Sequence, residues 1–236
     1  MVNLLGWLRQ KTDDYLHLNR IYNKAFRHRS YRGKTDFHGT EYGGWTIIPE
    51  ALSDSSVVYS FGIGEDASFD LEVIAHYGVE VHAFDPTPKS IRWVKNQTWP
   101  AQFHFYPLGI GASDRMATFY PPENPDHVSH TILPRNAALG QAIQVQLLRL
   151  KTIADMLDHD EITILKMDIE GAEYEVIDDL IKTSEIRVQQ VLVEFHHFLP
   201  NVAPEDTQAA IHKLVAAGYE VFNISKRGFE YSLVRQ

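Results

Sequence analysis

The chain has 236 residues, of which 44% are hydrophobic and 22% charged, a composition typical of one soluble domain with a full core. It contains no Cys, which excludes a disulfide scaffold, a thiolate nucleophile, a zinc–thiolate site and an iron–sulfur cluster. No apolar run reaches the roughly 18 residues that a membrane-spanning helix needs, and the first apolar stretch is too short for a signal peptide. We therefore expect a cytoplasmic protein without a transmembrane segment.

The net charge of −9 is unevenly distributed along the chain. Residues 1–35 hold eight Lys and Arg against two Asp and Glu, a charge of +6, which leaves −15 on residues 36–236. Nucleic-acid binding relies on clustered cations, so the acidic body argues against a nucleic-acid partner. The basic stretch is most typical of a solvated basic helix, with an anionic substrate, a membrane surface or an acidic neighbour as alternatives.

The basic stretch contains a predicted amphipathic helix from Thr12 to Arg29, because apolar residues recur there at helical spacing. A loop over residues 33–44, rich in Gly and polar residues, follows it. We divide the chain into an N-terminal helical extension, residues 1–38, and a main domain, residues 39–236. The apolar face of the helix is expected to cover the main domain or a second copy of the chain, which would make a homo-oligomer.

From residue 57 onward, apolar strands alternate with amphipathic helices. The predicted strands are 57–61, 79–84, 102–108, 117–120, 145–150, 162–167, 189–195, 219–224 and 229–234. The predicted helices are 68–77, 88–96, 172–181 and 204–217. This alternation predicts an α/β fold with a mostly parallel sheet covered on both faces, and the last two strands form a hairpin that adds one antiparallel strand. Ligands of such sheets bind beyond the carboxyl ends of the strands.

A glycine loop follows the first of these strands. Gly62-Ile63-Gly64-Glu65-Asp66-Ala67 fits the pattern G-x-G-x-x-G/A, and Asp85 ends the next strand, where its carboxylate can accept hydrogen bonds from a ribose. A bare turn is the alternative. Two acids beside the pyrophosphate of NAD would cost up to about 4 kcal/mol for a pair at about 4 Å and an effective dielectric constant of about 20. The loop therefore favours the cationic S-adenosylmethionine, with an NAD-dependent oxidoreductase as the alternative.

Acidic and histidine side chains follow two later strands. Asp168 and Glu170 come after strand 162–167, and Glu194 and His196 stand at the end of strand 189–195. Capping of the next helix accounts for Glu173 but not for Asp168 and Glu170 together. A histidine with a pKa near neutrality suits proton removal from a hydroxyl. We expect His196 to be the catalytic base, oriented by Glu194 or Glu170, with Asp168 as the second candidate.

The histidine spacings do not indicate a metal site. His196 and His197 are adjacent, and adjacent side chains on a strand point in opposite directions. His127 and His130 lie in a polar stretch and are interpreted as loop residues. No motif therefore gives a strong metal signal; we assign no residue to a metal and leave the metal requirement open at this point.

Two segments carry a family resemblance, Val81–Pro88 (VHAFDPTP) and Lys166–Glu173 (KMDIEGAE). They resemble the FkbM family of S-adenosylmethionine-dependent methyltransferases, and the match runs in order from about Gly39 to Phe198. The resemblance implies a class I (Rossmann-like) methyltransferase fold, with a seven-stranded sheet whose last strand is antiparallel. It also implies O-methylation of a small-molecule or glycan acceptor, such as a sugar, a glycolipid or a secondary metabolite.

The same resemblance implies which residues hold the methyl donor. Gly62 and Gly64 line it, Asp85 holds its ribose, Asp168 lies by its methionine end, and the segment Glu41–Trp45 closes over it. Glu65 and Asp66 stand where the family more often has Asn. The complete expected set is Trp45, Phe61, Gly62, Gly64, Glu65, Asp66, Asp85, Pro86 and Asp168.

Two further alternatives remain at this point. A nucleic-acid methyltransferase would need a cationic groove and a pocket for a flipped base. The acidic body and the lack of an Asn-Pro-Pro-aromatic motif count against it. A non-catalytic domain that binds S-adenosylmethionine is distinguished from an enzyme by an activity measurement.

Overall fold

A computed structural model describes residues 31, 33–121, 142–183, 185–197, 199 and 202–236. The predicted helix Thr12–Arg29 and the loop histidines His127 and His130 lie outside these described residues. The contact expected between that helix and a second copy of the chain therefore stays a prediction.

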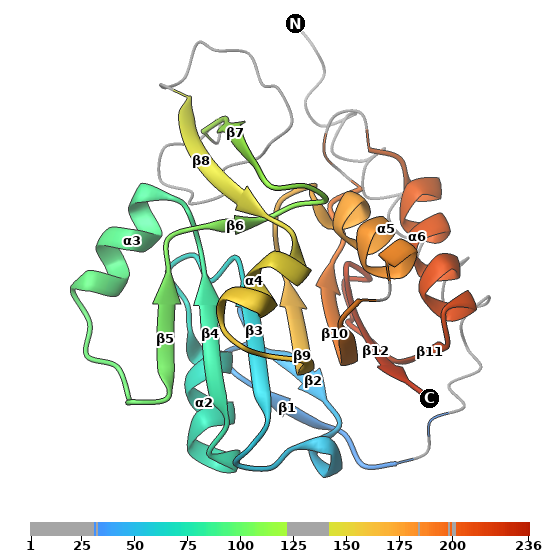
Figure 1. The fold of residues 1–236 in the computed structure, drawn as a ribbon. Helices are drawn as coiled ribbons and strands as arrows, with labels where there is room; N and C mark the ends of the chain where they lie inside the picture. Colours follow the sequence, from blue (N-terminus) through green and yellow to red (C-terminus); the bar gives the residue numbers. More distant parts are fainter. Residues whose placement is uncertain (1–30, 32, 122–141, 184, 198, 200–201) are drawn as a thin grey trace, which may run out of the picture.

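The core of the molecule is a seven-stranded sheet with the order β11-β12-β10-β9-β3-β4-β5 (Figure 1). Neighbouring strands from β10 to β5 run parallel, whereas β12 is antiparallel to both β10 and β11. This is the topology of a class I (Rossmann-like) methyltransferase fold, with the antiparallel last strand that the resemblance implied. The strands are β3 (Val57–Phe61), β4 (Glu80–Phe84), β5 (Phe103–Tyr106), β9 (Glu161–Met167), β10 (Arg187–Glu194), β11 (Tyr219–Ile224) and β12 (Glu230–Arg235).

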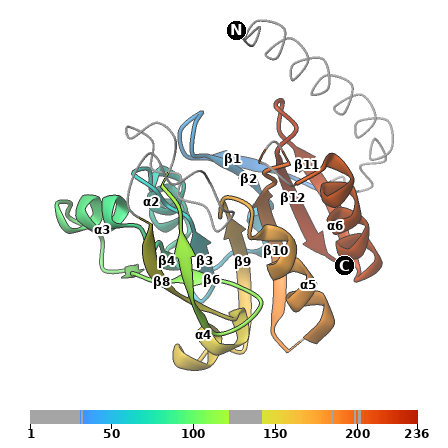
Figure 2. The same ribbon diagram turned by 90° about the horizontal axis from the view of Figure 1, so that it is seen from above.

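Both faces of the sheet are covered, which gives three layers. One face packs against α4 (Leu150–Met156), α5 (Glu173–Thr183) and α6 (Pro204–Ala216). The other packs against α2 (Ser68–Tyr77), α3 (Pro88–Lys95) and the hairpin β1 (Asp36–His38)–β2 (Trp45–Ile47), as the view from above shows (Figure 2). Side chains alternate between the layers: Tyr59 and Leu165 face α4 to α6, whereas Val58 and Ile164 face α2. Burial of each such side chain contributes about 1.5–3 kcal/mol.

The helix ends follow from local sequence. α2 ends at Gly78, whose φ of 71° lies in the left-handed region that favours glycine, and its N–H donates to Ile74 O at 2.8 Å. α3 begins at Pro88, where the fixed φ of proline suits the first helical turn. None of the described helices is both long and apolar enough to cross a membrane.

A small second sheet stands beyond the carboxyl ends of the main strands (Figure 1). It has the order β6-β8-β7 and consists of β6 (Gly109–Ile110), β7 (Arg115–Phe119) and β8 (Ile143–Leu148). The predicted strand 102–108 was wrong at its end, because β5 stops at Tyr106 and the chain turns into β6. The predicted strand 145–150 was displaced by two residues from β8, and Leu150 begins α4, a helix that was not predicted.

The segment predicted as a loop over residues 33–44 contains a strand. β1 pairs antiparallel with β2, and the hairpin lies on the same face of the sheet as α2. The boundary drawn after residue 38 falls inside this hairpin, which therefore belongs to both predicted segments of the chain.

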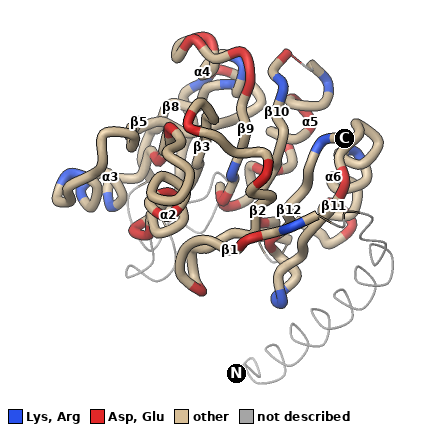
Figure 3. Tube along the Cα trace, turned by 90° about the horizontal axis from the view of Figure 1, so that it is seen from below, with Lys and Arg blue, Asp and Glu red and all other residues tan. Residues whose placement is uncertain are grey.

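Acidic residues occur throughout the described chain, whereas one helix carries only basic residues among its charged ones (Figure 3). Asp and Glu occur on most elements, including α2, α5 and the turn before β9, whereas α3 carries Lys89, Arg92 and Lys95. The acidic character predicted for the main domain is therefore distributed over its surface rather than confined to one patch.

Candidate functional site

Two loops meet at the point where the strand order reverses. The chain runs from β3 to β4 and β5 on one side, and from β9 to β10 on the other, so the carboxyl ends of β3 and β9 flank a crevice. Gly62, directly after β3, has a φ of +75°, and a Cβ on it would lie 1.7 Å from the carbonyl oxygen of Asp168, directly after β9. Only glycine fits this contact, which brings the two sequence motifs together.

Buried polar side chains hold the glycine loop in place. The ammonium of Lys166 donates to Gly62 O at 2.7 Å and to Phe61 O at 3.3 Å. Asp85 accepts from Gly64 N at 3.0 Å and from the Thr87 side chain at 2.7 Å. The loop after β3 is thus fixed by groups from β9 and from the end of β4. Lys166 was not among the expected site residues although it begins the motif Lys166–Glu173, since nothing in the sequence shows that its ammonium reaches the glycine loop.

The two acids of the glycine loop have partners of their own. Glu65 Oε2 lies 3.1 Å from the ammonium of Lys89. Asp66 accepts from Ser68 N and from the Thr40 hydroxyl, both at 2.7 Å. Burial opposes ionisation, but these hydrogen bonds outweigh it and lower the pKa of Asp66. Asp66 therefore stabilises the start of α2 and the β1–β2 turn, and Glu65 pairs with α3. The electrostatic argument against a pyrophosphate is weaker than the sequence suggested.

Two aromatic residues expected at the donor are packed inside the protein. Phe61 stacks on Phe84 with ring centroids 4.4 Å apart, and Trp45 lies in the apolar layer around α2. Pro86 is half-buried beside Gly109. The rings of Phe61 and Trp45 are therefore not available to contact a donor, and only the backbone of these residues could do so.

Within the segment Glu41–Trp45, Tyr42 is the residue near the acidic groups. Its side chain is 80% exposed. Partial burial of the hydroxyl and the nearby carboxylates of Asp168, Glu194 and Glu170 raise the pKa of Tyr42. Tyr42 was expected only as part of the segment Glu41–Trp45 and not by itself, because an aromatic residue in a polar turn gives no specific signal.

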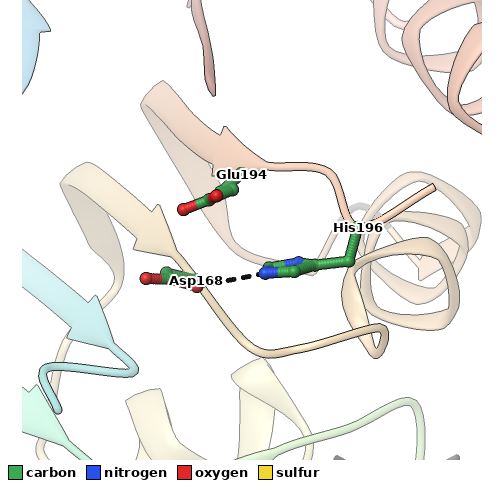
Figure 4. Close-up of side chains that lie close together, drawn as sticks. All are labelled: Asp168, Glu194 and His196. Atoms are coloured by element: carbon green, nitrogen blue, oxygen red, sulfur yellow. Dashed lines mark ion pairs between the residues drawn. The ribbon is translucent and has the colours of Figure 1, made fainter. Parts of the chain in front are cut away.

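Three of the expected catalytic side chains converge beyond the sheet (Figure 4). Asp168 follows β9, Glu194 ends β10, and His196 lies two residues further on. One side-chain nitrogen or oxygen from each lies within 4.8 Å of the others, and His196 Nε2 is 3.5 Å from Asp168 Oδ1. We call this group the Asp168–Glu194–His196 cluster.

Glu173 holds the histidine of this cluster from behind. It is the first residue of α5, is 0% exposed, and accepts from His196 Nδ1–H at 2.5 Å and from Gly171 N at 3.0 Å. Glu170 adds a carboxylate 3.8 Å from His196 Nε2, on a residue with a left-handed φ of 52°. The sequence had assigned Glu173 to helix capping alone, because nothing local shows that α5 starts beside a residue 23 positions later.

The carboxylates around His196 control its charge. Burial alone would lower the pKa of the imidazole, but Glu173, Glu170 and Asp168 outweigh burial and raise it to about 10. At neutral pH His196 therefore carries a proton on both nitrogens. A group in that state donates a proton or stabilises negative charge, which differs from the base expected from the sequence.

The pKa values of the neighbouring carboxyl groups are raised as well. Burial and the charge of Asp168 raise the pKa of Glu194 to about 8, against the opposing effect of His196. Burial also raises the pKa of Asp168, and Lys166 opposes it. Both carboxyl groups therefore take up protons unusually easily, as expected where several carboxylates share a confined space.

His197 turns away from the cluster, as expected for adjacent residues. Its Nδ1 lies 3.3 Å from the hydroxyl of Thr207 on α6. Burial and the charge of His196 lower the pKa of His197 to about 4.

A family model described as "Methyltransferase FkbM domain" matches residues 57–221, from the start of β3 into β11. Probable methyltransferase-like protein 24 from Homo sapiens is 25% identical over 155 residues, which make up 65% of this chain and 36% of that protein. The protein of the same name from Rattus norvegicus is 24% identical over the same shares. The chain thus matches about a third of the length of these curated relatives.

Two solved structures are similar at low identity. The methyltransferase FkbM from Methylobacillus flagellatus has a TM-score of 0.49 and 13% identity, covering 78% of this chain and 44% of that one. The fibrillarin pre-rRNA processing protein of Methanococcus jannaschii has a TM-score of 0.46 and 11% identity, covering 80% of this chain and 69% of that one. With the family model matching most of its length, the chain belongs to the FkbM methyltransferase family.

Proposed function

We propose that this domain transfers a methyl group from S-adenosylmethionine to a hydroxyl oxygen of a sugar, a glycolipid or a secondary metabolite. The observation that carries the proposal is the contact of Gly62 with the Asp168 carbonyl at the reversal of strand order. Membership of the FkbM family supports methyl transfer itself. S-adenosylmethionine would supply a methyl carbon made electrophilic by the adjoining sulfonium.

The residues of the crevice suit that donor. The turn at Gly62 and Gly64 lets a ligand approach the backbone, and Asp85, at the end of the next strand, offers carboxylate oxygens to a ribose. The carboxylate of Asp168 matches the positive charge of the methionine end. Lys166 keeps the turn in place through its hydrogen bonds to Phe61 and Gly62.

The Asp168–Glu194–His196 cluster would activate the acceptor. As the acceptor oxygen bonds to the methyl carbon, the carbon–sulfur bond breaks, its electrons stay on sulfur, and the hydroxyl loses its proton. Alignment lowers such a barrier by roughly 7–11 kcal/mol at best, and a base adds a factor of about 10²–10⁴. Because His196 carries a proton at neutral pH, and a pKa of about 8 keeps Glu194 largely protonated there as well, we assign the base to Asp168 and give His196 and Glu170 the task of holding the acceptor oxygen.

Thermal unfolding with two competing ligands tests donor binding. At a concentration of about 100 times its dissociation constant, adenosylhomocysteine should add about 2.7 kcal/mol of stability, a rise of roughly 5–10 °C in Tm. NAD should leave Tm unchanged. A shift with NAD and none with adenosylhomocysteine would contradict the proposal and support an oxidoreductase.

Transfer of a labelled methyl group to a panel of hydroxyl and amine acceptors tests the reaction. We expect label on hydroxyl acceptors only. Asp85→Asn, checked for folding by circular dichroism, should weaken adenosylhomocysteine binding at least about tenfold, whereas Asp54→Asn, at the amino edge of the sheet, should not. Label on amines alone would contradict O-methylation.

A further inference from the structure

The Asp168–Glu194–His196 cluster has the composition of a metal-binding site. It brings two carboxylates and one imidazole together from the ends of two adjacent parallel strands (Figure 4). Side chains of these types are the common ligands of divalent cations in proteins. The sequence did not suggest such a site, because its members come from segments about 26 residues apart that only the sheet brings together.

The orientation of His196 sets this cluster apart from a group of surface acids. His196 is 2% exposed, and its Nδ1–H is held by the fully buried Glu173 at 2.5 Å. Its Nε2 therefore points to Asp168 at 3.5 Å and to Glu170 at 3.8 Å. Metal-ligating histidines are fixed in this way, with one nitrogen on a carboxylate and the other on the metal.

The charges near the cluster are also out of balance. Asp168, Glu170, Glu173 and Glu194 surround a single imidazole. Arg227 approaches Glu194 at 3.7 Å from an exposed position, and the ammonium of Lys166 acts on Asp168 while it donates to the glycine loop. A divalent cation at the centre would compensate the remaining carboxylate charge.

The spacing of the side chains is compatible with one ion. Ligands about 2.1–2.2 Å from a metal are about 3 Å apart at right angles and about 4.3 Å apart on opposite sides. The three atoms lie within 4.8 Å of one another. The side chains of Asp168 and Glu194 are 34% and 17% exposed, so small rotations of these carboxylates bring the atoms to ligand distances.

We propose that Asp168, Glu194 and His196 bind one divalent transition-metal cation on the acceptor side of the crevice, for which Mn²⁺ is the probe. Mg²⁺ and Ca²⁺ prefer oxygen ligands alone, whereas transition-metal ions accept an imidazole together with carboxylates. The ion takes the place of the proton on His196 Nε2. Glu173 is then a positioning residue, which fixes the ring without touching the metal.

The ion also has a chemical role, and this part rests on the proposed methyl transfer. A cation that binds the acceptor hydroxyl stabilises the negative charge that develops on its oxygen as the proton leaves. With the ion bound, it would hold the acceptor oxygen in place of the His196 N–H, and the oxygen of Asp168 that does not bind the ion would accept the proton.

Binding of Mn²⁺ to the full chain tests the site directly. The electron paramagnetic resonance signal of free Mn²⁺ and isothermal titration should both show one ion per chain. Glu194→Gln should weaken Mn²⁺ binding more than tenfold. The matched control Glu175→Gln removes a carboxylate of α5 that pairs with Arg115, and should leave Mn²⁺ binding unchanged. Glu173→Gln should weaken binding by about 10–100-fold without removing a ligand.

The adenosylhomocysteine-induced rise in Tm, measured on the same variants, separates this inference from the proposed function. We expect Glu194→Gln to keep that rise, which also shows that the variant is folded. No Mn²⁺ binding at millimolar concentration, or equal binding by Glu194→Gln and Glu175→Gln, would overturn the metal site and leave methyl transfer standing. Mn²⁺ binding without any effect of adenosylhomocysteine would overturn the proposed function and leave the metal site standing.

Discussion

Two buried histidines on the same sheet have opposite properties. His196, beyond the carboxyl end of β10, is surrounded by carboxylates, and its pKa is raised to about 10. His82, within β4, lies against His104 and His159, with ring centroids 5.0 and 4.8 Å away, and its pKa is lowered to about 4. Since both are less than a tenth exposed, burial does not distinguish them. The neighbouring charges do, and they concentrate at the edge of the sheet that carries the proposed site.

The largest expected effect comes from removing the carboxylate partner of a histidine in each region. Glu173→Ala should cost about 3–5 kcal/mol of unfolding free energy, because it leaves the buried charge of His196 without its closest partner. Glu80→Ala removes the exposed partner of His104 and should cost at most about 1 kcal/mol. Urea unfolding of both variants at pH 7 measures the two losses of unfolding free energy. Similar losses would contradict the proposed difference between the surroundings of His196 and those of His104.

Glycines at the two edges of the sheet should differ as well. Gly62→Ala and Gly78→Ala both put a side chain on left-handed backbone, which costs about 1 kcal/mol. At Gly78 the new Cβ has 3.7 Å of clearance, whereas at Gly62 it meets the Asp168 carbonyl. We expect about 2–4 kcal/mol for Gly62→Ala, from strain and overpacking together, and about 1 kcal/mol for Gly78→Ala. Thermal unfolding checks both, and equal shifts in Tm would argue against the tight contact.

Acid should destabilise the protein through His82. Its folded pKa of about 4 lies below the unfolded value of about 6.5, so the unfolded chain takes up the proton first as pH falls. Stability is therefore lost between about pH 6.5 and 4, by up to about 3 kcal/mol. His82→Phe keeps a ring in place and should reduce that loss, while His197, whose pKa is also lowered to about 4, keeps its own share of it. Tyr106→Phe removes the hydrogen bond to His82 but keeps the imidazole, so its pH dependence should match the wild type.

The smallest expected effect concerns single hydroxyls. Thr40→Val removes the hydrogen bond from the β1–β2 turn to Asp66, and should cost about 0.5–1.5 kcal/mol. Ser53→Ala, at the amino edge, removes a bond between two exposed hydroxyls and should cost less than about 0.5 kcal/mol. If Thr40→Val leaves both stability and adenosylhomocysteine binding unchanged, the turn does not support the glycine loop.

Most of the main sheet could be predicted because its strands are apolar runs buried on both faces. Ile162 to Met167 is such a run, and its strand begins only one residue earlier. The hairpin β1–β2 could not be predicted, because strands of three residues show no periodicity. α4 has seven residues and depends on packing against the sheet, so its helical pattern is equally short.

The candidate site also has a part that could be predicted from the sequence and a part that could not. Gly62, Asp85, Asp168 and His196 follow strands and could be singled out from the sequence. The contact of Glu173 with His196 joins α5 to the end of β10, and the contact of Lys166 with Gly62 joins β9 to β3. Such contacts depend on which strands become neighbours, which the local sequence does not encode.

The order of the strands also affects how the site is assembled during synthesis. β12 pairs with β10 along Gln190 to Glu194, and Glu230 stands opposite Glu194 itself. When the ribosome has made β10, one side of that strand therefore lacks its partner, and it stays open until residues 230–235 have emerged. Glu194 and the turn to His196 are held on both sides only from that moment. The domain is thus expected to gain donor affinity before it can bind an acceptor, since the glycine loop depends on strands made earlier.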